Sequence, residues 1–181
     1  VARAREAAGD EERFIFIEHE NKGQSAARNA ALDVAKGAYV VNLDADDYYV
    51  PETLETLVNR MQADTLDVLF FAASTFYETR ELRRTHPENQ DNRQSIPGVF
   101  TGPELYVRFE ETGAFRPSAC MFMVKRAVLD EAHVRFEEGI IHEDLLFTMQ
   151  IFPLAQRAAF ENVSLYRRRM REGSPMTSTR G

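Results

Sequence analysis

The sequence has one cysteine, no tryptophan and no long hydrophobic run. The single cysteine, Cys120, excludes an internal disulfide framework and fits a reducing compartment. No apolar stretch approaches the roughly 20 residues that are needed to span a bilayer. Positive charge is outnumbered by negative charge, because 22 Lys and Arg residues stand against 29 Asp and Glu residues and the formal net charge is −7. This balance argues against nucleic acid or an anionic membrane surface as the main partner. We therefore expect a cytoplasmic protein, either free or peripheral at the inner face of the membrane.

The first half of the chain alternates between two kinds of hydrophobic pattern. Apolar, β-rich runs at 14–19, 38–43 and 67–78 enclose helical patterns at 26–36 and 51–63. This order predicts an α/β fold in which helices flank a mostly parallel sheet. Ligands bind beyond the carboxyl ends of strands in such sheets, so the loops after these strands are the first candidates for a site.

The second half is less regular. A polar stretch without periodicity predicts a mobile surface loop at 79–98, and the composition of 170–181 predicts a flexible tail. The remaining patterns predict helices at 102–112, 127–132 and 143–152, a strand at 118–126, and two short strands at 157–162 and 163–169.

Three carboxylates follow the apolar run at 38–43, namely Asp44, Asp46 and Asp47. In an extended backbone Asp44 and Asp46 would face one side and Asp47 the other. Two carboxylates about 5 Å apart repel by about 3 kcal/mol at an effective dielectric of 20. A divalent cation would turn this repulsion into binding and leave positions for substrate phosphates. The structural alternative is an Asp-rich turn that caps the following helix.

A second acidic pair, Glu143 and Asp144, opens the helix predicted at 143–152. Acidic residues in a first turn also suit the helix dipole, which is the structural alternative. A carboxylate near a metal–phosphate site can instead take a proton from a substrate hydroxyl. The neighbouring His142 could be a ligand, a base or a capping residue.

Three segments together resemble the nucleotide-sugar-binding domain of family 2 glycosyltransferases. They are NKGQSAARN followed by AKGAYVVNLDADD within 20–58, GIIHEDLLFT at 139–148, and LYRRRMREGSPMTS at 165–178. The resemblance implies a GT-A-like, Rossmann-like fold with a mostly parallel sheet and flanking helices. It also implies that residues 1–181 form a single, partial catalytic domain.

The resemblance implies inverting sugar transfer from a nucleoside-diphosphate donor, a UDP-sugar, to a hydroxyl of a sugar or glycolipid acceptor. The expected setting is the synthesis of surface polysaccharide or glycoconjugates. Asp46 would hold Mg²⁺ or Mn²⁺ against the diphosphate, and Asp44 would lie near the ribose or the metal's water shell. Asp144 would deprotonate the acceptor hydroxyl, and Glu143 would support Asp144 or contact the acceptor.

Further residues are assigned to substrate binding. Asn21 and Arg28 match the loop and helix start beside the bound donor. Arg169 and Arg171 match a closing segment and could pair with the diphosphate, where a guanidinium fits bidentately. Their structural alternative is a solvated basic edge strand. The set is completed by Asp47 and His142.

The family's usual N-terminal strands, with their Pro-x-Tyr-Asn-like and Asp-Asp-Gly-Ser-like motifs, have no match here. Val1 falls inside the helix that should follow them. We therefore expect an N-terminally truncated domain, whose exposed sheet edge could support a homo-oligomer. The sequence also lacks the Gln-x-x-Arg-Trp motif of processive enzymes, which favours transfer of single sugars.

Two other functions fit parts of the sequence. The chain could be a non-catalytic fragment that binds a metal or a partner protein. It could also be a haloacid-dehalogenase-like phosphatase, which places an Asp-x-Asp motif after a buried strand. The phosphatase motif continues with Thr or Val where this chain has Tyr48, and it usually follows the first strand.

Overall fold

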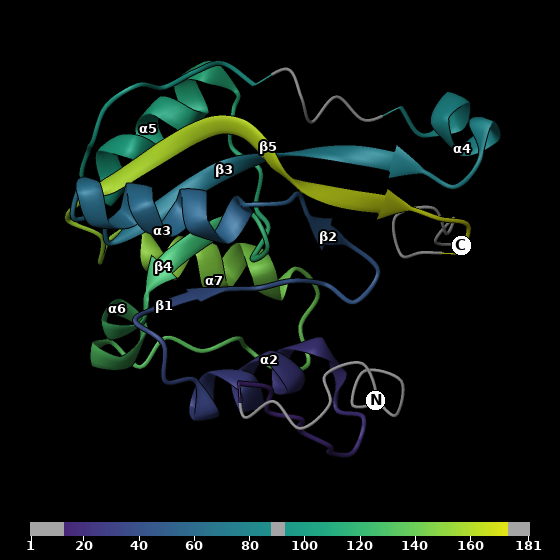
Figure 1. The fold of residues 1–181 in the computed structure, drawn as a ribbon, viewed down its shortest axis with the longest axis horizontal. Coiled ribbons are helices and arrows are strands. Elements are labelled where there is room, and N and C mark those ends of the chain that lie inside the picture. The colour runs from purple at the N-terminus through teal and green to yellow at the C-terminus, as the bar shows by residue number, and fades with distance from the viewer. Residues whose placement is uncertain (1–12, 88–92, 174–181) are drawn as a thin grey trace.

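The computed structural model describes residues 13–87 and 93–173, and these form a five-stranded sheet with helices packed around it (Figure 1). The strand order is β1-β4-β3-β5-β2. The strands are β1 (Tyr39–Val41), β2 (Tyr48–Tyr49), β3 (Val68–Tyr77), β4 (Phe122–Lys125) and β5 (Ala158–Met170). The helices are α2 (Gly23–Val34), α3 (Thr53–Ala63), α4 (Arg80–Thr85), α5 (Gly102–Thr112), α6 (Arg126–Glu131) and α7 (Glu143–Ile151).

The sheet is mixed, so the prediction of a mostly parallel sheet is wrong. β3 and β5 pair in parallel, whereas β4 is antiparallel to both β1 and β3, and β2 is antiparallel to β5. β4 comes from the second half of the chain and inserts between β1 and β3. The alternation of strands and helices in the first half gives the direction of β1 and β3, but it contains no information about a strand that enters later.

The predicted strand at 14–19 does not form. Phe14 and Ile15 are 52% and 58% exposed, and no strand is present between residues 13 and 22. A strand needs a neighbour for its N–H and C=O groups. Within the described residues no strand pairs with this segment or with the outer edge of β1. A homo-oligomer through that edge stays a prediction.

The five predicted helices form, and α5 is the one among them whose N-terminus has a side-chain cap. α5 begins with a capping box in which Glu104 N donates to the Thr101 hydroxyl and Thr101 N donates to the Glu104 carboxylate. It ends at Gly113, whose φ of 62° is in the left-handed region that favours glycine. These signals lie within a few residues of the two ends of α5, so the sequence alone is enough to place this helix.

The range 79–98 is not a loop throughout. It contains α4, in which Leu82 N donates to the Thr79 hydroxyl, and it contributes the buried Arg93 and Ile96. Residues 88–92 lie outside the described part, as do residues 174–181 of the predicted tail. The two short strands predicted near the end are one strand, β5, which is interrupted by register shifts opposite β3.

Hydrophobic residues cover both faces of the central strand. Val68, Phe70 and Ala72 of β3 pack with residues of α5 and α7, while the alternating Leu69 and Phe71 pack with residues of α3 (Figure 1). This alternation follows from the twofold repeat of a strand. Because β3 is buried on both sides, it holds β4 and β5 in fixed places, and the polar loops at the ends of these strands are held with them.

β3 and β5 continue beyond this core as a pair of strands, with α4 at their far end (Figure 1). Residues 74–77 of β3 are less buried than residues 68–73. Their partners in β5 are Arg167, Arg168, Arg169 and Met170. The projecting pair therefore has more polar side chains than the core of the sheet.

Replacing Gly102 with alanine should destabilise the fold. An added Cβ would overlap the backbone carbonyl of Phe152, which cannot move without shifting the end of α7. Overpacking of this kind costs about 1–3 kcal/mol of unfolding free energy. Gly37→Ala is the control, because its Cβ would lie 3.4 Å from the nearest atom, the Tyr39 carbonyl oxygen. Urea unfolding of both variants measures the difference, and equal stability would contradict the packing at Gly102.

Candidate functional site

The guanidinium of Arg28 joins the two acidic motifs. Arg28 Nη2 donates to Asp44 Oδ1 at 2.8 Å, and Nη1 donates to Glu143 Oε1 at 3.0 Å. Arg28 lies on α2, Asp44 follows β1, and Glu143 opens α7, 115 residues from Arg28 in sequence. The tertiary structure therefore brings three of the predicted site residues together around one positive charge.

This bridge is anchored on the buried side. The Glu143 side chain is 6% exposed and that of Arg28 14%, whereas Asp44 is 46% exposed. Burial by itself lowers the pKa of Arg28, but the hydrogen bond and charge of Asp44 act together with the charge of Glu143 against burial, and the pKa is raised. The Phe136 ring lies 5.2 Å from the guanidinium carbon, a cation–π distance. Arg28 therefore stays charged and compensates the buried carboxylate.

Asp44, Asp46 and Asp47 do not follow the alternation expected of an extended backbone. Asp47 N donates to Asp44 O at 3.1 Å, which closes a turn. Asp44 faces Arg28 on α2, whereas Asp46 Oδ2 accepts from Arg171 Nε at 2.9 Å. The prediction that Asp44 and Asp46 share one side of a strand is therefore wrong, because the strand ends before them.

Asp47 fastens this turn to β5. Its Oδ1 accepts from the backbone N–H of Arg169 at 2.7 Å, and its Oδ2 accepts from the Tyr166 hydroxyl. Burial raises the pKa of Asp47, and the charges of Asp46 and Asp44 add to that effect. Both oxygens of Asp47 thus have protein donors, so its contacts are those of a residue that positions the loop.

Arg169 in β5 and Arg171 just after β5, which were predicted to act together, have different partners. The hydrogen bond to Asp46 raises the pKa of Arg171. The guanidinium of Arg169 instead donates to Glu78, at the end of β3. Of these two arginines, Arg171 is therefore the one whose side chain contacts the Asp-x-Asp motif.

The start of α7 separates its two acids. His142 precedes them in the left-handed region, with φ 65° and ψ 39°, and its exposed side chain does not cap the helix. Asp144 is half-buried, and its Oδ1 accepts from Leu145 N at 2.9 Å. Burial raises the pKa of Asp144, and the adjacent charge of Glu143 raises it further. Glu143 is held by a cation, while Asp144 is the acid whose affinity for a proton is increased.

Asn21 lies before α2, and its Oδ1 accepts from Gly23 N at 3.1 Å, which orders the turn at the helix start. No contact within the described residues joins the Asn21 side chain to the acidic motifs. It is exposed, so it remains available to a ligand.

Three supporting residues were missed by the sequence analysis. Gln24 donates to Glu143, Tyr166 donates to Asp47, and the Tyr49 hydroxyl donates to Asn42 O at 2.6 Å. Burial raises the pKa of both tyrosines, so they remain neutral donors. A buried tyrosine usually has a partner for its hydroxyl. The positions of Tyr49, just after the three aspartates, and of Tyr166, in the LYRRR segment, could therefore have indicated that these hydroxyls support the site.

The carboxylates fit a cation that is coordinated partly by the protein and partly by a substrate. Across residues 13–87 and 93–173, no cluster of three or more His, Cys, Asp or Glu side chains could hold a metal ion. Asp44 and Asp46 offer oxygen ligands at a partly exposed turn. Mg²⁺ is commonly bound through one or two carboxylates together with substrate phosphates and water. The donor set therefore suits Mg²⁺ or Mn²⁺ in the presence of a diphosphate.

Comparison with known families gives a direct match. The model of the family described as glycosyl transferase family 2 matches residues 1–132. An uncharacterized glycosyltransferase of Escherichia coli, YibD, is 32% identical over 84% of this chain and 44% of its own length. A cholesterol galactosyltransferase of Borreliella burgdorferi is 27% identical over 92% of this chain and 48% of its own length. The chain thus spans less than half of either relative.

A third relative is named for its substrates. The Escherichia coli protein WfaP, a UDP-Glc:α-D-GlcNAc-diphosphoundecaprenol β-1,3-glucosyltransferase, is 33% identical over 45% of this chain and 27% of its own length. Among solved structures, Staphylococcus aureus TarS residues 1–349 in complex with UDP-GlcNAc superposes with a TM-score of 0.67 at 24% identity. That match covers 91% of this chain and 44% of the TarS chain, and it shows the same fold.

Among the described residues, none of the helices combines the length and apolar character needed to cross a membrane.

Replacing Arg28 with methionine should destabilise the fold by about 3–5 kcal/mol, because it leaves the buried Glu143 without a counter-charge. Arg135→Met is a matched control. Arg135 donates to Asp33 at 3.2 Å, but both side chains are exposed, and such pairs contribute at most about 1 kcal/mol. Chemical unfolding measures both changes. The double variant Arg28→Met with Glu143→Gln should recover part of the loss. If Arg28→Met were as mild as Arg135→Met, the bridge would have no structural importance.

Proposed function

The chain belongs to glycosyltransferase family 2, and from that premise we propose that it carries out inverting transfer of a sugar from a UDP-sugar to a hydroxyl of a sugar or glycolipid acceptor. Mg²⁺ or Mn²⁺ takes part, and the setting is the synthesis of surface polysaccharide or glycoconjugates. The observation that carries the proposal is the Arg28 bridge, which joins the donor-side aspartate to the acid pair of α7. Family membership also removes the phosphatase alternative.

Two of the proteins in the comparisons support the choice of donor and acceptor. TarS was solved with UDP-GlcNAc, and the name of WfaP specifies a UDP-sugar donor and a diphosphate-linked lipid acceptor. We propose a UDP-sugar donor and a sugar or glycolipid acceptor for this chain by analogy. The chain spans only part of each of these proteins, so the complete reaction is a proposal about the domain to which these residues belong.

On the donor side, Asp46 would hold the cation and Asp44 would lie near its water shell or the ribose. When bound, the cation neutralises charge that develops on the diphosphate as it leaves. Arg171 already lies at hydrogen-bond distance from Asp46, so its guanidinium can contact a diphosphate that binds beside that carboxylate. Asp47 holds the turn against β5, and Arg169 extends the same basic edge.

On the acceptor side, Asp144 is the proposed base. It takes the proton of the acceptor hydroxyl as the hydroxyl oxygen attacks the anomeric carbon and the bond to the diphosphate breaks, which inverts the configuration. The raised pKa of Asp144 suits this role, because a general base is most effective when its pKa lies close to the working pH. Glu143 tunes Asp144 and secures Arg28, while the exposed His142 and Asn21 would contact the acceptor and the donor.

The alternative function is that of a non-catalytic module that binds a metal or a partner protein. The exposed Phe14 and Ile15 and the unpaired outer edge of β1, as judged from the described residues, are the observations that favour it. A chain of this kind would bind Mn²⁺ or a partner protein but would neither hydrolyse nor transfer the donor sugar.

Asp46→Asn should abolish the Mn²⁺-dependent part of UDP binding, because an amide oxygen is a weaker ligand without a negative charge. Isothermal titration of UDP with Mn²⁺ and with EDTA measures this part. The control is Asp33→Asn, which changes an aspartate that pairs with Arg135 on the surface. If Asp46→Asn kept the full effect of Mn²⁺ on UDP affinity, Asp46 would not be the metal ligand.

Asp144→Asn should retain UDP binding and lose transfer by about 10²–10⁴-fold. In the wild type, transfer should fall as the pH falls through the raised pKa of Asp144, because the protonated carboxyl cannot accept a proton. Glu143→Gln removes a charge that raises this pKa, so the acidic limb of kcat/KM should move to lower pH. A pH profile of sugar transfer measures both effects. Full transfer by Asp144→Asn would exclude Asp144 as the base.

A further inference from the structure

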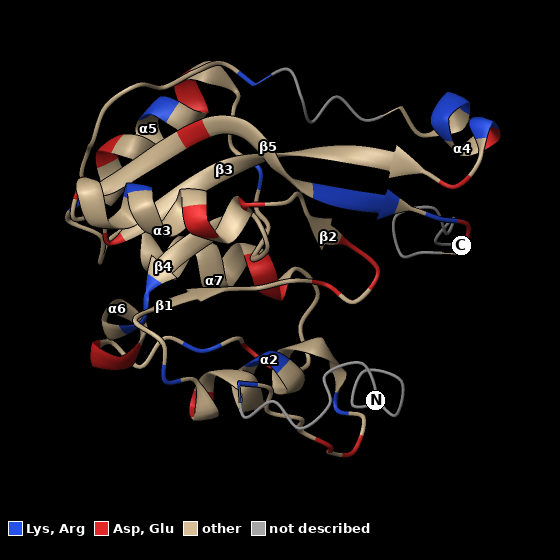
Figure 2. Ribbon diagram, viewed as in Figure 1, with Lys and Arg blue, Asp and Glu red and all other residues tan. Residues whose placement is uncertain are grey.

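The projecting ends of β3 and β5, together with α4, form a positively charged region of an otherwise acidic chain. We call it the basic arm and define it as residues 74–87 and 167–173. It contains seven arginines and three glutamates, whereas the chain as a whole has a formal net charge of −7. Figure 2 shows the positive residues gathered on the end of β5 and on α4. Repulsion between these arginines would be relieved by an anion.

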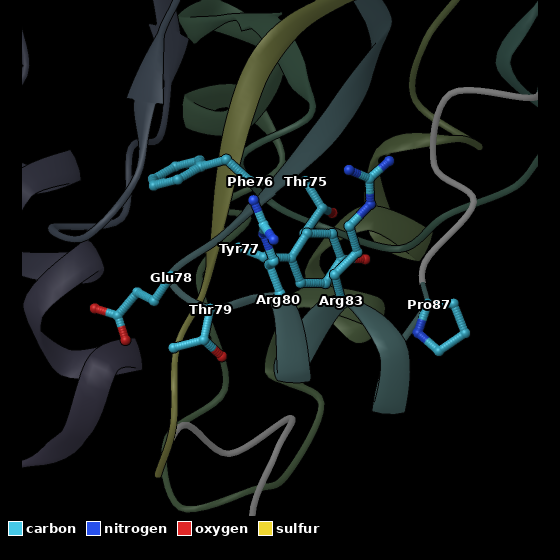
Figure 3. A pocket seen from close by; sticks show the side chains of 8 residues that line it. All are labelled: Thr75, Phe76, Tyr77, Glu78, Thr79, Arg80, Arg83 and Pro87. Atoms are coloured by element: carbon cyan, nitrogen blue, oxygen red, sulfur yellow. The ribbon is translucent and has the colours of Figure 1, made fainter.

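Residues 75–87 of the basic arm line a pocket that is open to solvent and has a volume of about 620 Å³. This size suits a small ligand. Arg80 and Arg83 of α4 are three residues apart and therefore lie on the same side of the helix. Figure 3 shows both side chains extending from α4 towards Thr75 and Phe76, while Glu78 points away from them. The pocket thus presents two guanidinium groups from one helical turn.

The two acidic residues of 74–87, Glu78 and Glu81, are already paired with arginines. Glu78 accepts from Arg169, and Glu81 accepts from Arg84 at 2.9 Å. Within the described part of the chain, Arg80 and Arg83 form no ion pair. Two positive charges therefore face the pocket, and no acidic side chain of residues 13–87 and 93–173 pairs with them.

The walls of the pocket add a donor and fix its shape. The Thr79 hydroxyl oxygen accepts from Leu82 N at 3.1 Å, which leaves its proton available for an acceptor in the pocket. The Tyr77 hydroxyl donates to His86 O at 3.1 Å and thereby ties the end of α4 to β3. The donors of the pocket are thus positioned by the fold.

The pocket is close to the candidate catalytic loop. Glu78 lines the pocket and pairs with Arg169, and the backbone N–H of Arg169 donates to Asp47. One ion pair and one hydrogen bond thus connect the pocket with the turn that presents Asp46. The end of β5 therefore links a ligand held by α4 to that turn.

We propose that this pocket binds a phosphate or diphosphate group of the acceptor, with Arg80 and Arg83 as its charged donors and Thr79 as a third donor. One guanidinium satisfies a carboxylate, whereas a phosphate has enough oxygens for two guanidinium groups and a hydroxyl. The assignment of the phosphate to the acceptor rests on the proposed function. The binding of phosphate by the pocket does not depend on it.

The direct test uses inorganic pyrophosphate with EDTA at low ionic strength, so that no metal contributes. The double variant Arg80→Gln with Arg83→Gln should bind pyrophosphate roughly tenfold more weakly than the wild type, because two charge-assisted contacts are lost. Arg84→Gln, which changes an arginine of the same helix that pairs with Glu81, should bind like the wild type. Equal affinity of the double variant and the wild type in isothermal titration would overturn the proposal.

All three arginines are exposed, so the variants should unfold at the wild-type temperature. If the double variant were less stable, the single variants Arg80→Gln and Arg83→Gln should each weaken pyrophosphate binding by about threefold. Unchanged affinity in both single variants would also overturn the proposal.

Two further experiments distinguish the possible sources of the phosphate. Co-sedimentation with phosphatidylcholine vesicles that contain phosphatidic acid, lost in the double variant, would assign the site to a lipid headgroup. Displacement of pyrophosphate by soluble polyphosphate, without vesicle binding, would assign it to a phosphate-bearing polymer.

In a transfer assay, the double variant should raise the KM for a phosphate-bearing acceptor and leave the KM for the donor unchanged. Arginine-dependent pyrophosphate binding without sugar transfer would refute the proposed function and leave the phosphate pocket intact.

Discussion

The ion pairs of Arg28 are the interaction on which the arrangement of the site depends. Glu143 is buried and would be unfavourable as an isolated charge, so the fold requires a cation beside it. Arg28 supplies this cation from α2 and extends its second nitrogen to Asp44. The same contact that compensates a buried carboxylate thus sets the distance between the turn after β1 and the start of α7. Stability and the geometry of the proposed reaction are therefore coupled at one side chain.

The turn that carries the three aspartates is held by a different device. It is attached to β5 through Asp47, whose two oxygens accept from Tyr166 and from the backbone of Arg169. β5 in turn pairs with β3, which is covered on both faces by hydrophobic residues. The polar turn is thus fixed to β5 through Tyr166, which is buried in the core, and through Arg169, which lies in the projecting pair of strands. These contacts leave Asp44 and Asp46 partly exposed on a turn whose backbone is held in place. Such support is what a site for a diphosphate and a cation requires.

Net charge describes this molecule poorly. The overall balance of −7 argued against anionic partners, yet seven arginines gather on the basic arm. Electrostatic attraction over a few ångströms depends on local charge, because salt screens contributions from charges beyond about 10 Å. The register between β3 and β5 brings Arg167 and Arg169 beside residues of β3, and α4 adds two arginines that have no acidic partner in the described residues. This separation of charge gives an acidic chain a site for an anion.

The sequence alone was sufficient for features that depend on neighbouring residues. It predicted five of the six described helices, and at α5 the capping pair of Thr101 and Glu104 lies within one turn of the helix end, whereas α4 lay in a stretch predicted as a loop. It also identified both acidic motifs, because each follows or begins an element. Only the tertiary structure decided how these elements meet. The insertion of β4 made the sheet mixed, the segment at 14–19 found no partner strand among the described residues, and the aspartates formed a turn in which Asp44 and Asp46 face different arginines. Strand pairing and ion pairs join residues that are distant in sequence, so no local pattern can specify them.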